Sequence, residues 1–135
     1  MAYIDSNVFI YPIIYDPEAV PEANRSKALL LEVATGGIEA HTASITWDEV
    51  VWAIRRLLGP DISLDRGRRL LSFPNLRFLA VKRGTVAKAQ GLMERDGLRP
   101  RDALHAAAAL ENGLTTIVSY DEDFDRIEGI RRREP

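Results

Sequence analysis

Short apolar segments alternate with longer amphipathic ones along the whole chain, and this alternation limits the possible fold more than any other feature of the sequence. Glycine or proline stands at most of the boundaries, at positions 36–37, 59–60, 74, 97, 100 and 113. Strands that alternate with helices favour a parallel sheet joined by right-handed crossovers. We therefore predict an α/β fold with helices on both faces of the sheet.

The pattern also gives approximate boundaries for the elements. We predict strands at residues 2–4, 38–42, 76–81 and 115–119, and a short edge strand at 130–133. We predict helices at residues 8–14, 22–35, 46–58, 61–73, 84–95 and 101–112, and a helical turn at 121–126. Thr46 and Glu49 have the spacing of a capping box that opens the third helix. The length of 135 residues suits a single domain, residues 1–135.

Composition excludes several classes of protein. With 46% hydrophobic and 28% charged residues, the chain is typical of globular proteins. No apolar run approaches the roughly 20 residues that span a bilayer, and the amino terminus lacks the pattern of a secretory signal, so we expect a cytoplasmic protein without a membrane partner. The absence of cysteine excludes disulfides, thiolate zinc sites and cysteine nucleophiles, and two histidines argue against a histidine-rich metal site.

Four carboxylates occupy positions where a strand ends or a helix begins: Asp5, Glu49, Asp102 and Asp121. In a parallel α/β sheet, the carboxyl ends of strands and the amino ends of helices meet at one edge, where ligands bind. The four side chains are therefore expected to converge. Like charges at close range raise each other's pKa or require a cation, and oxygen ligands suit Mg²⁺ or Mn²⁺.

Each carboxylate also has a structural explanation. Asp5 and Asp121 fit helix caps, Glu49 fits the capping box, and Asp102 fits a first-turn acid that the helix dipole favours. For any one residue taken alone, the structural explanation is the stronger. Capping gives no reason for four acids to meet on one edge, so the set together favours a metal site.

Four segments in order resemble the PIN domain family. They are residues 4–9 (IDSNVF), Glu49, residues 101–109 (RDALHAAAA) and residues 118–125 (VSYDEDFD). Each segment is short, but their order and spacing cover essentially the whole chain. The chain most resembles the small, single-domain prokaryotic members typified by VapC toxins.

This resemblance implies a three-layer α/β/α fold with a central, mostly parallel sheet of four to five strands. It implies an endoribonuclease that depends on one or two Mg²⁺ or Mn²⁺ ions and leaves 5′-phosphate and 3′-hydroxyl ends. Asp5, Glu49, Asp102 and Asp121 would be its catalytic and metal-binding residues, with Asp5 and Asp102 as the central ligands. The resemblance further implies the toxin of a VapBC-like toxin-antitoxin pair, a homodimer that an antitoxin protein holds inactive.

Several nearby residues are candidates for supporting roles. Asn7 and Ser119 match polar family positions near the metal, although turn and cap chemistry explains them equally well. Asp123 is a better supporting candidate than the neighbouring acid at position 125. Arg101 is the strongest candidate for a contact with an RNA phosphate, because it adjoins Asp102. His105 is expected to be a packed or supporting histidine and not a ligand.

The alternatives differ in how well they fit. Trp47 and Trp52 flank Glu49 and suit stacking on a base, but burial in the core or a dimer contact is the favoured explanation. A haloacid-dehalogenase-like phosphatase requires an aspartate where this chain has Asn7. A response-regulator receiver requires an aspartate after the third strand, where this chain has 81–83 (VKR). The remaining alternative is a catalytically silent PIN-like module that binds RNA or protein, which the four intact acids disfavour.

Overall fold

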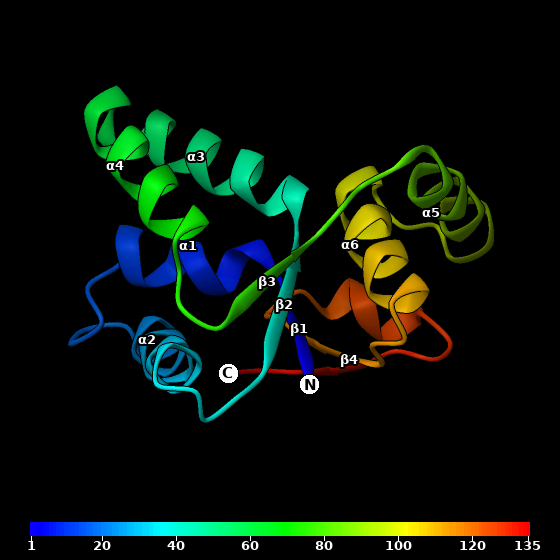
Figure 1. Ribbon diagram of the computed structural model, residues 1–135, viewed down its shortest axis with the longest axis horizontal. Helices are drawn as coiled ribbons and strands as arrows, with labels where there is room; N and C mark the ends of the chain where they lie inside the picture. The colour runs from blue at the N-terminus through cyan, green and yellow to red at the C-terminus, as the bar shows by residue number, and fades with distance from the viewer.

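Five parallel strands form one sheet in the order β3-β2-β1-β4-β5 (Figure 1) in the computed structural model, which describes residues 1–135. The strands are β1 Ala2–Ile4, β2 Ala40–Ala43, β3 Leu76–Leu79, β4 Thr116–Val118 and β5 Arg131–Arg133. The predicted parallel sheet and its number of strands are confirmed, including the short strand at one edge.

Six α-helices and one 3₁₀ helix connect these strands. They are α1 Ser6–Ile14, α2 Pro21–Ala34, α3 Ser44–Leu58, α4 Pro60–Leu71, α5 Arg83–Asp96, α6 Pro100–Glu111 and η1 Glu122–Arg126. None of these helices combines the length and the apolarity that a bilayer crossing requires. All lie within about two residues of the predicted boundaries, which is the usual uncertainty at helix ends.

The predicted capping box at Thr46 is wrong. Helix α3 begins two residues earlier, at Ser44, and its N-cap residue is Ala43. Thr46 therefore lies inside the helix, where it is buried and its hydroxyl lies 2.6 Å from that of Thr42. Because Thr46 is not the N-cap residue, Glu49 forms no capping box with it, and the Glu49 side chain is free to bond to other elements.

The helices form two layers, one on each face of the sheet (Figure 1). Because side chains alternate along a strand, Ala2 and Ile4 pack with α1, α2, α3 and α4, and Tyr3 packs with α5 and α6. Tyr3 and Ile4 are both fully buried, so β1 is covered on both faces. The expected three-layer α/β/α architecture is confirmed.

The strand order reverses at β1, and this reversal fixes where a ligand can bind. The chain builds β2 and β3 outward on one side of β1, and then returns to place β4 and β5 on the other side. In open parallel sheets, the crevice outside the carboxyl ends of the strands at such a reversal is the usual ligand site. Asp5 and Ser119 directly follow the two strands that meet there, and the backbone N–H of Asp5 donates to Val118, 3.0 Å away.

Candidate functional site

The four predicted carboxylates line one polar pocket of about 480 Å³ at this end of the sheet. They come from four different elements: the N-cap of α1, the interior of α3, the first turn of α6 and the N-cap of η1. None of the residues that line the pocket is hydrophobic; the list is Asp5, Ser6, Asn7, Glu49, Arg99, Pro100, Arg101, Asp102 and Asp121. The structure thus brings together the residues that the sequence analysis selected.

Asp5 is buried and rigidly held. Its Oδ1 accepts from the backbone N–H of Ser6 at 2.8 Å, and its Oδ2 accepts from the hydroxyl of Ser119 at 2.6 Å. Burial raises the pKa of Asp5, and the nearby charge of Glu49 adds to that rise, whereas His105 and Ser119 lower it. The carboxylate therefore has a fixed orientation and incompletely compensated charge.

His105 is the buried basic partner of the carboxylates on this side of the pocket. It lies three residues after Asp102 on α6 and is fully buried. Its Nε2 forms a short contact with Oε1 of Glu49 and lies 3.5 Å from Oδ1 of Asp5, and its Nδ1 lies 2.5 Å from the Tyr3 hydroxyl. Burial alone lowers the pKa of His105, but the hydrogen bond to Glu49 and the charge of Asp5 raise it overall. From its buried position, His105 therefore opposes the negative charge of two carboxylates, Asp5 and Glu49.

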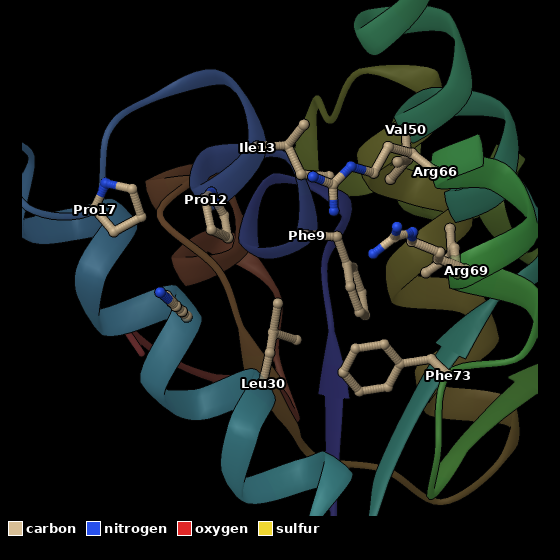
Figure 2. Close-up of a pocket in the computed structure, with 11 residues that line it drawn as sticks. Phe9, Pro12, Ile13, Pro17, Leu30, Val50, Arg66, Arg69 and Phe73 are labelled. Atoms are coloured by element: carbon tan, nitrogen blue, oxygen red, sulfur yellow. The ribbon is translucent and has the colours of Figure 1, made fainter. Parts of the chain in front are cut away.

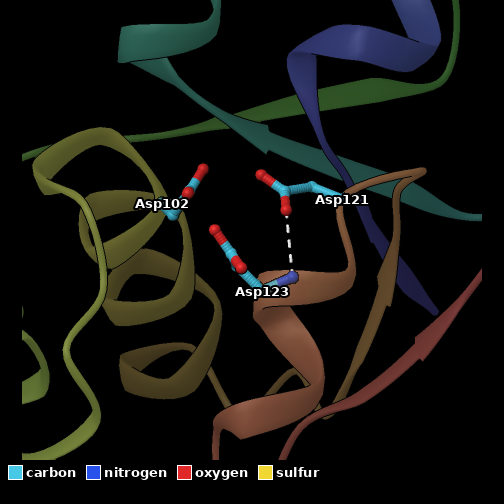
Figure 3. Close-up of side chains that lie close together, drawn as sticks. All are labelled: Asp102, Asp121 and Asp123. Atoms are coloured by element: carbon cyan, nitrogen blue, oxygen red, sulfur yellow. Dashed lines mark hydrogen bonds between the residues drawn. The ribbon is translucent and has the colours of Figure 1, made fainter.

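A second acidic group consists of Asp102, Asp121 and Asp123, whose side chains lie close together (Figure 3). One carboxylate oxygen from each of Asp102, Asp121 and Asp123 lies within 4.8 Å of the others. Oδ1 of Asp121 also accepts from the backbone N–H of Asp123 at 2.9 Å, which fixes the turn that carries both acids. Asp123 thus joins the site, whereas Asp125 pairs with Arg132 at 3.0 Å and lies outside it.

Arg99 compensates this second group from the solvent side. Its guanidinium lies 3.5 Å from Asp102, 3.4 Å from Asp121 and 3.4 Å from Asp123, while its side chain remains 72% exposed. The sequence analysis selected Arg101 and missed Arg99. The spacing of three residues between Arg99 and Asp102 on one helical face is the signal that identifies it.

The chemistry of these side chains fits a hard divalent cation. Oδ2 of Asp102 is buried and accepts no hydrogen bond. The pKa of Asp102 is raised to about 6, first by burial and then by the charges of Asp121 and Asp5. Carboxylate oxygens with incompletely compensated charge are the ligands that Mg²⁺ and Mn²⁺ prefer, and the chain has no cysteine to supply a thiolate ligand. Asp102, Asp121 and Asp123 are therefore the group best arranged to hold an ion, next to Asp5.

Ser119 links the two acidic groups. Its hydroxyl donates to Asp5, and its oxygen accepts from the backbone N–H of Asp121 at 2.9 Å and from Nδ2 of Asn7 at 3.1 Å. Oδ1 of Asn7 is buried without a hydrogen-bond partner. Ser119 and Asn7 thus fix the relative positions of Asp5 and Asp121.

A larger cavity of about 510 Å³ lies elsewhere, between α1, α2 and α4 (Figure 2). Its wall is largely apolar, with Phe9, Leu30 and Phe73 among the residues that line it. Lys27, Arg66 and Arg69 also line it, and no carboxylate does. This cavity cannot perform the chemistry of the acidic pocket, but it offers an apolar surface bordered by cations.

Comparisons with known proteins agree with this geometry. The family model described as PIN domain matches residues 2–130. The fold resembles Mycobacterium tuberculosis VapC20, described as a sarcin-ricin loop cleaving toxin, with a TM-score of 0.78 and 16% identity over 100% of both chains. It also resembles VapBC2 from Rickettsia felis bound to a promoter DNA fragment, with a TM-score of 0.72 and 18% identity over 99% of this chain and 98% of the other.

A third similar structure is DNA-bound VapBC from Salmonella typhimurium, with a TM-score of 0.68 and 20% identity over 98% of this chain and 96% of the other. No curated protein sequence matches the chain significantly. At these identities, the structural similarity establishes the shared fold and not a shared substrate.

The raised pKa of Asp102 predicts how stability depends on pH. The pKa of Asp102 is about 6 in the folded protein and 3.8 in the unfolded chain, so the folded state binds the proton more tightly. The free energy of unfolding therefore decreases as pH rises from about 4 to 6. Asp102→Asn removes this decrease in stability, because the amide does not ionise. In EDTA, we expect the variant to be more stable than the wild type at pH 8, by at most about 3 kcal/mol, and equally stable near pH 4.

Urea unfolding at both pH values measures this difference. Asp125→Asn is the matched control, because Asp125 pairs with Arg132 outside the pocket and its removal should give no gain at pH 8. A lower stability of Asp102→Asn at pH 8 would contradict the assignment of uncompensated charge to Asp102.

The position of His105 predicts a large effect of its removal. His105→Gln deletes the imidazole that bonds to Glu49 and faces buried Asp5, so we expect the free energy of unfolding at pH 7 to fall by about 3 kcal/mol. His41→Gln is the control, since His41 is also buried but its Nδ1 has no hydrogen-bond partner and it compensates no carboxylate of the pocket. Urea unfolding of both variants checks the prediction, and equal losses would contradict it.

Proposed function

The chain belongs to the PIN domain family, and from that premise we propose that it is a Mg²⁺- or Mn²⁺-dependent endoribonuclease, which hydrolyses phosphodiester bonds of RNA. The observation that carries this proposal is the convergence of Asp5, Glu49, Asp102 and Asp121 on one pocket without a hydrophobic wall. Such a pocket suits a phosphate and a hard cation together. We expect products with 5′-phosphate and 3′-hydroxyl ends.

We propose that Asp5, Glu49, Asp102 and Asp121 hold one or two ions, with Asp123 in support. Oδ2 of Asp102 accepts no hydrogen bond and is faced only by the largely exposed Arg99 at 3.5 Å. This geometry and the raised pKa of Asp102 support the proposal, because both indicate negative charge that the protein compensates only in part. When bound, the ion supplies Lewis acidity, which activates water and neutralises charge on the phosphate.

The protein groups around the acids hold them in position before substrate binds. Ser119 and the backbone of Ser6 orient Asp5. Glu49 is held at both oxygens, by His105 at Oε1 and by the hydroxyl of Ser6 at Oε2, 3.3 Å away. Preorganised polar groups of this kind need no rearrangement during the reaction. Arg101 lines the same pocket without a carboxylate partner, which supports its role as a phosphate contact.

We further propose that the chain acts in the cytoplasm as the toxin of a VapBC-like pair, as a homodimer that an antitoxin regulates. Two similar structures are VapBC complexes, which supports a protein partner for this fold. The cavity between α1, α2 and α4 is the surface of this chain that suits such a partner. Its apolar wall and its cations, Lys27, Arg66 and Arg69, fit a segment that carries both apolar and acidic side chains.

Cleavage of a labelled, mixed-sequence single-stranded RNA tests the nuclease proposal. We expect cleavage with Mg²⁺ or Mn²⁺ and none with EDTA. Asp102→Asn should reduce the rate by at least about 100-fold, because it removes a ligand and a buried negative charge. Asp125→Asn should leave the rate unchanged, since that residue lies outside the pocket. RNA binding without cleavage in any metal would support the silent binding module instead.

Co-expression tests the partner proposal. We expect the wild-type chain to slow bacterial growth and the product of a short open reading frame beside its gene to relieve this effect and to co-purify with it. Arg66→Glu should weaken that co-purification about 10-fold or more, because it places a negative charge at the cavity. Arg68→Glu, on the same helix but not lining the cavity, is the control. Equal retention of both variants would contradict docking at this cavity.

A further inference from the structure

An exposed tryptophan stands beside the acidic pocket. Trp52 lies on α3 three residues after Glu49, so the two side chains share a face of the helix and are separated by a rise of about 4.5 Å. The Trp52 side chain is 47% exposed, which excludes the core position that the sequence left open for it. A large aromatic ring exposed next to a polar site requires another explanation.

Two arginines flank the Trp52 ring. The guanidinium carbon of Arg56, one turn further along α3, lies 4.6 Å from the ring centroid, and that of Arg101, on α6, lies 5.6 Å from it. Neither arginine forms an ion pair, whereas Arg99 pairs with three acids. Arg101 also lines the acidic pocket, so the cluster of Trp52, Arg56 and Arg101 is continuous with the site.

We propose that Trp52 is a stacking platform that holds an unpaired base of the RNA substrate beside the acidic pocket, while Arg56 and Arg101 contact the adjacent phosphates. An indole face that attracts guanidinium groups also attracts nucleobases, and every base offers a π-face. Arginine exchanges readily between an aromatic ring and a phosphate because its planar fork suits both. This inference rests on the proposed function and specifies its substrate as RNA with an unpaired base near the scissile bond.

The charge at this surface favours RNA over a second copy of the chain. A symmetric contact centred on Trp52 would bring Arg56 and Arg101 of both copies close together, although neither arginine forms an ion pair within its own chain. Burial of uncompensated like charges is costly, whereas a polyanion compensates them. RNA is therefore the occupant that the observed residues fit.

Trp47 provides an internal comparison on the same helix. Its side chain packs against α4, with Nε1 only 3.1 Å from the position that a Cβ atom on Gly67 would occupy. It does not line the acidic pocket, and no arginine stacks on its ring. Trp47 is 40% exposed, but its contact with α4 gives it a packing role, and because no arginine stacks on its ring it serves as the control for Trp52.

Binding of a short, labelled single-stranded RNA in EDTA, where the proposed nuclease cannot turn over, tests this inference. We expect Trp52→Ala to weaken binding about 5- to 150-fold, which is the range for loss of one stacked base, and Trp52→Phe to retain most of the affinity. Trp47→Phe should bind as the wild type does. The effect of Trp52→Ala should disappear with a fully paired duplex, because stacking requires an unpaired base.

Intrinsic fluorescence gives a second readout that a purely structural role would not change. In Trp47→Phe, where Trp52 is the only tryptophan, RNA should quench the emission. In Trp52→Phe, where Trp47 is the only tryptophan, RNA should leave the emission nearly unchanged. Equal quenching of both variants, unchanged affinity of Trp52→Ala, or the absence of RNA binding by the wild type would overturn the inference.

Sedimentation of the same variants distinguishes the competing occupant. If Trp52→Ala converts a dimer to a monomer and leaves RNA affinity unchanged, Trp52 belongs to a protein interface and the inference fails. The nuclease proposal fails separately, if the wild type binds RNA through Trp52 but cleaves none with Mg²⁺ or Mn²⁺. Conversely, metal-dependent cleavage that Trp52→Ala leaves intact supports the nuclease and overturns the platform.

Discussion

Negative charge gathered at the carboxyl edge of a parallel sheet is the constraint on which the rest of this structure depends. Asp5 and Asp121 must follow β1 and β4, and the two strands meet where the strand order reverses. Repulsion among such groups destabilises the fold unless neighbouring charges oppose it. The elements that surround the pocket therefore supply compensation as well as carboxylates, and α6 supplies both through Asp102 and His105.

The two sides of the pocket are compensated in physically different ways. His105 is fully buried and is held by Tyr3, so it cannot leave Asp5 and Glu49 without disturbing the core. Arg99 is mostly exposed, and its contacts of 3.4 to 3.5 Å with the acids are screened by solvent. Arg99 can therefore move away from the acids at little cost, whereas His105 cannot. This difference supports Asp102 and Asp121 as the acids that exchange a side-chain cation for a metal.

The convergence of the four acids on one pocket was predicted from the sequence, whereas the contacts that the basic side chains of His105 and Arg99 make with them were not. Convergence of Asp5, Glu49, Asp102 and Asp121 follows from a general rule of parallel sheets, which requires only the order of strands and helices along the chain. The order of the strands in the sheet depends on pairing between distant segments, and no local pattern encodes it. The capping box failed for a local reason: α3 begins at Ser44, two residues earlier than predicted, so Thr46 lies inside the helix and its hydroxyl contacts that of Thr42 in β2. The contact of His105 with Glu49 likewise joins two helices whose packing only the folded chain defines.

The absence of hydrophobic residues from the acidic pocket has a consequence for substrate choice. A pocket lined by acids, amides, hydroxyls and arginines can hold a phosphate and a cation, but it offers no aromatic ring on which a base can stack. Aromatic stacking of a base must then come from residues at its border. On one side, Tyr120 stacks on Tyr11 at 4.8 Å, and its hydroxyl bonds to Ser26 and to the backbone of Glu22, so this ring serves the fold. On the other side, the Trp52 ring remains exposed between two unpaired arginines, which makes that border the side from which an unpaired base can be read.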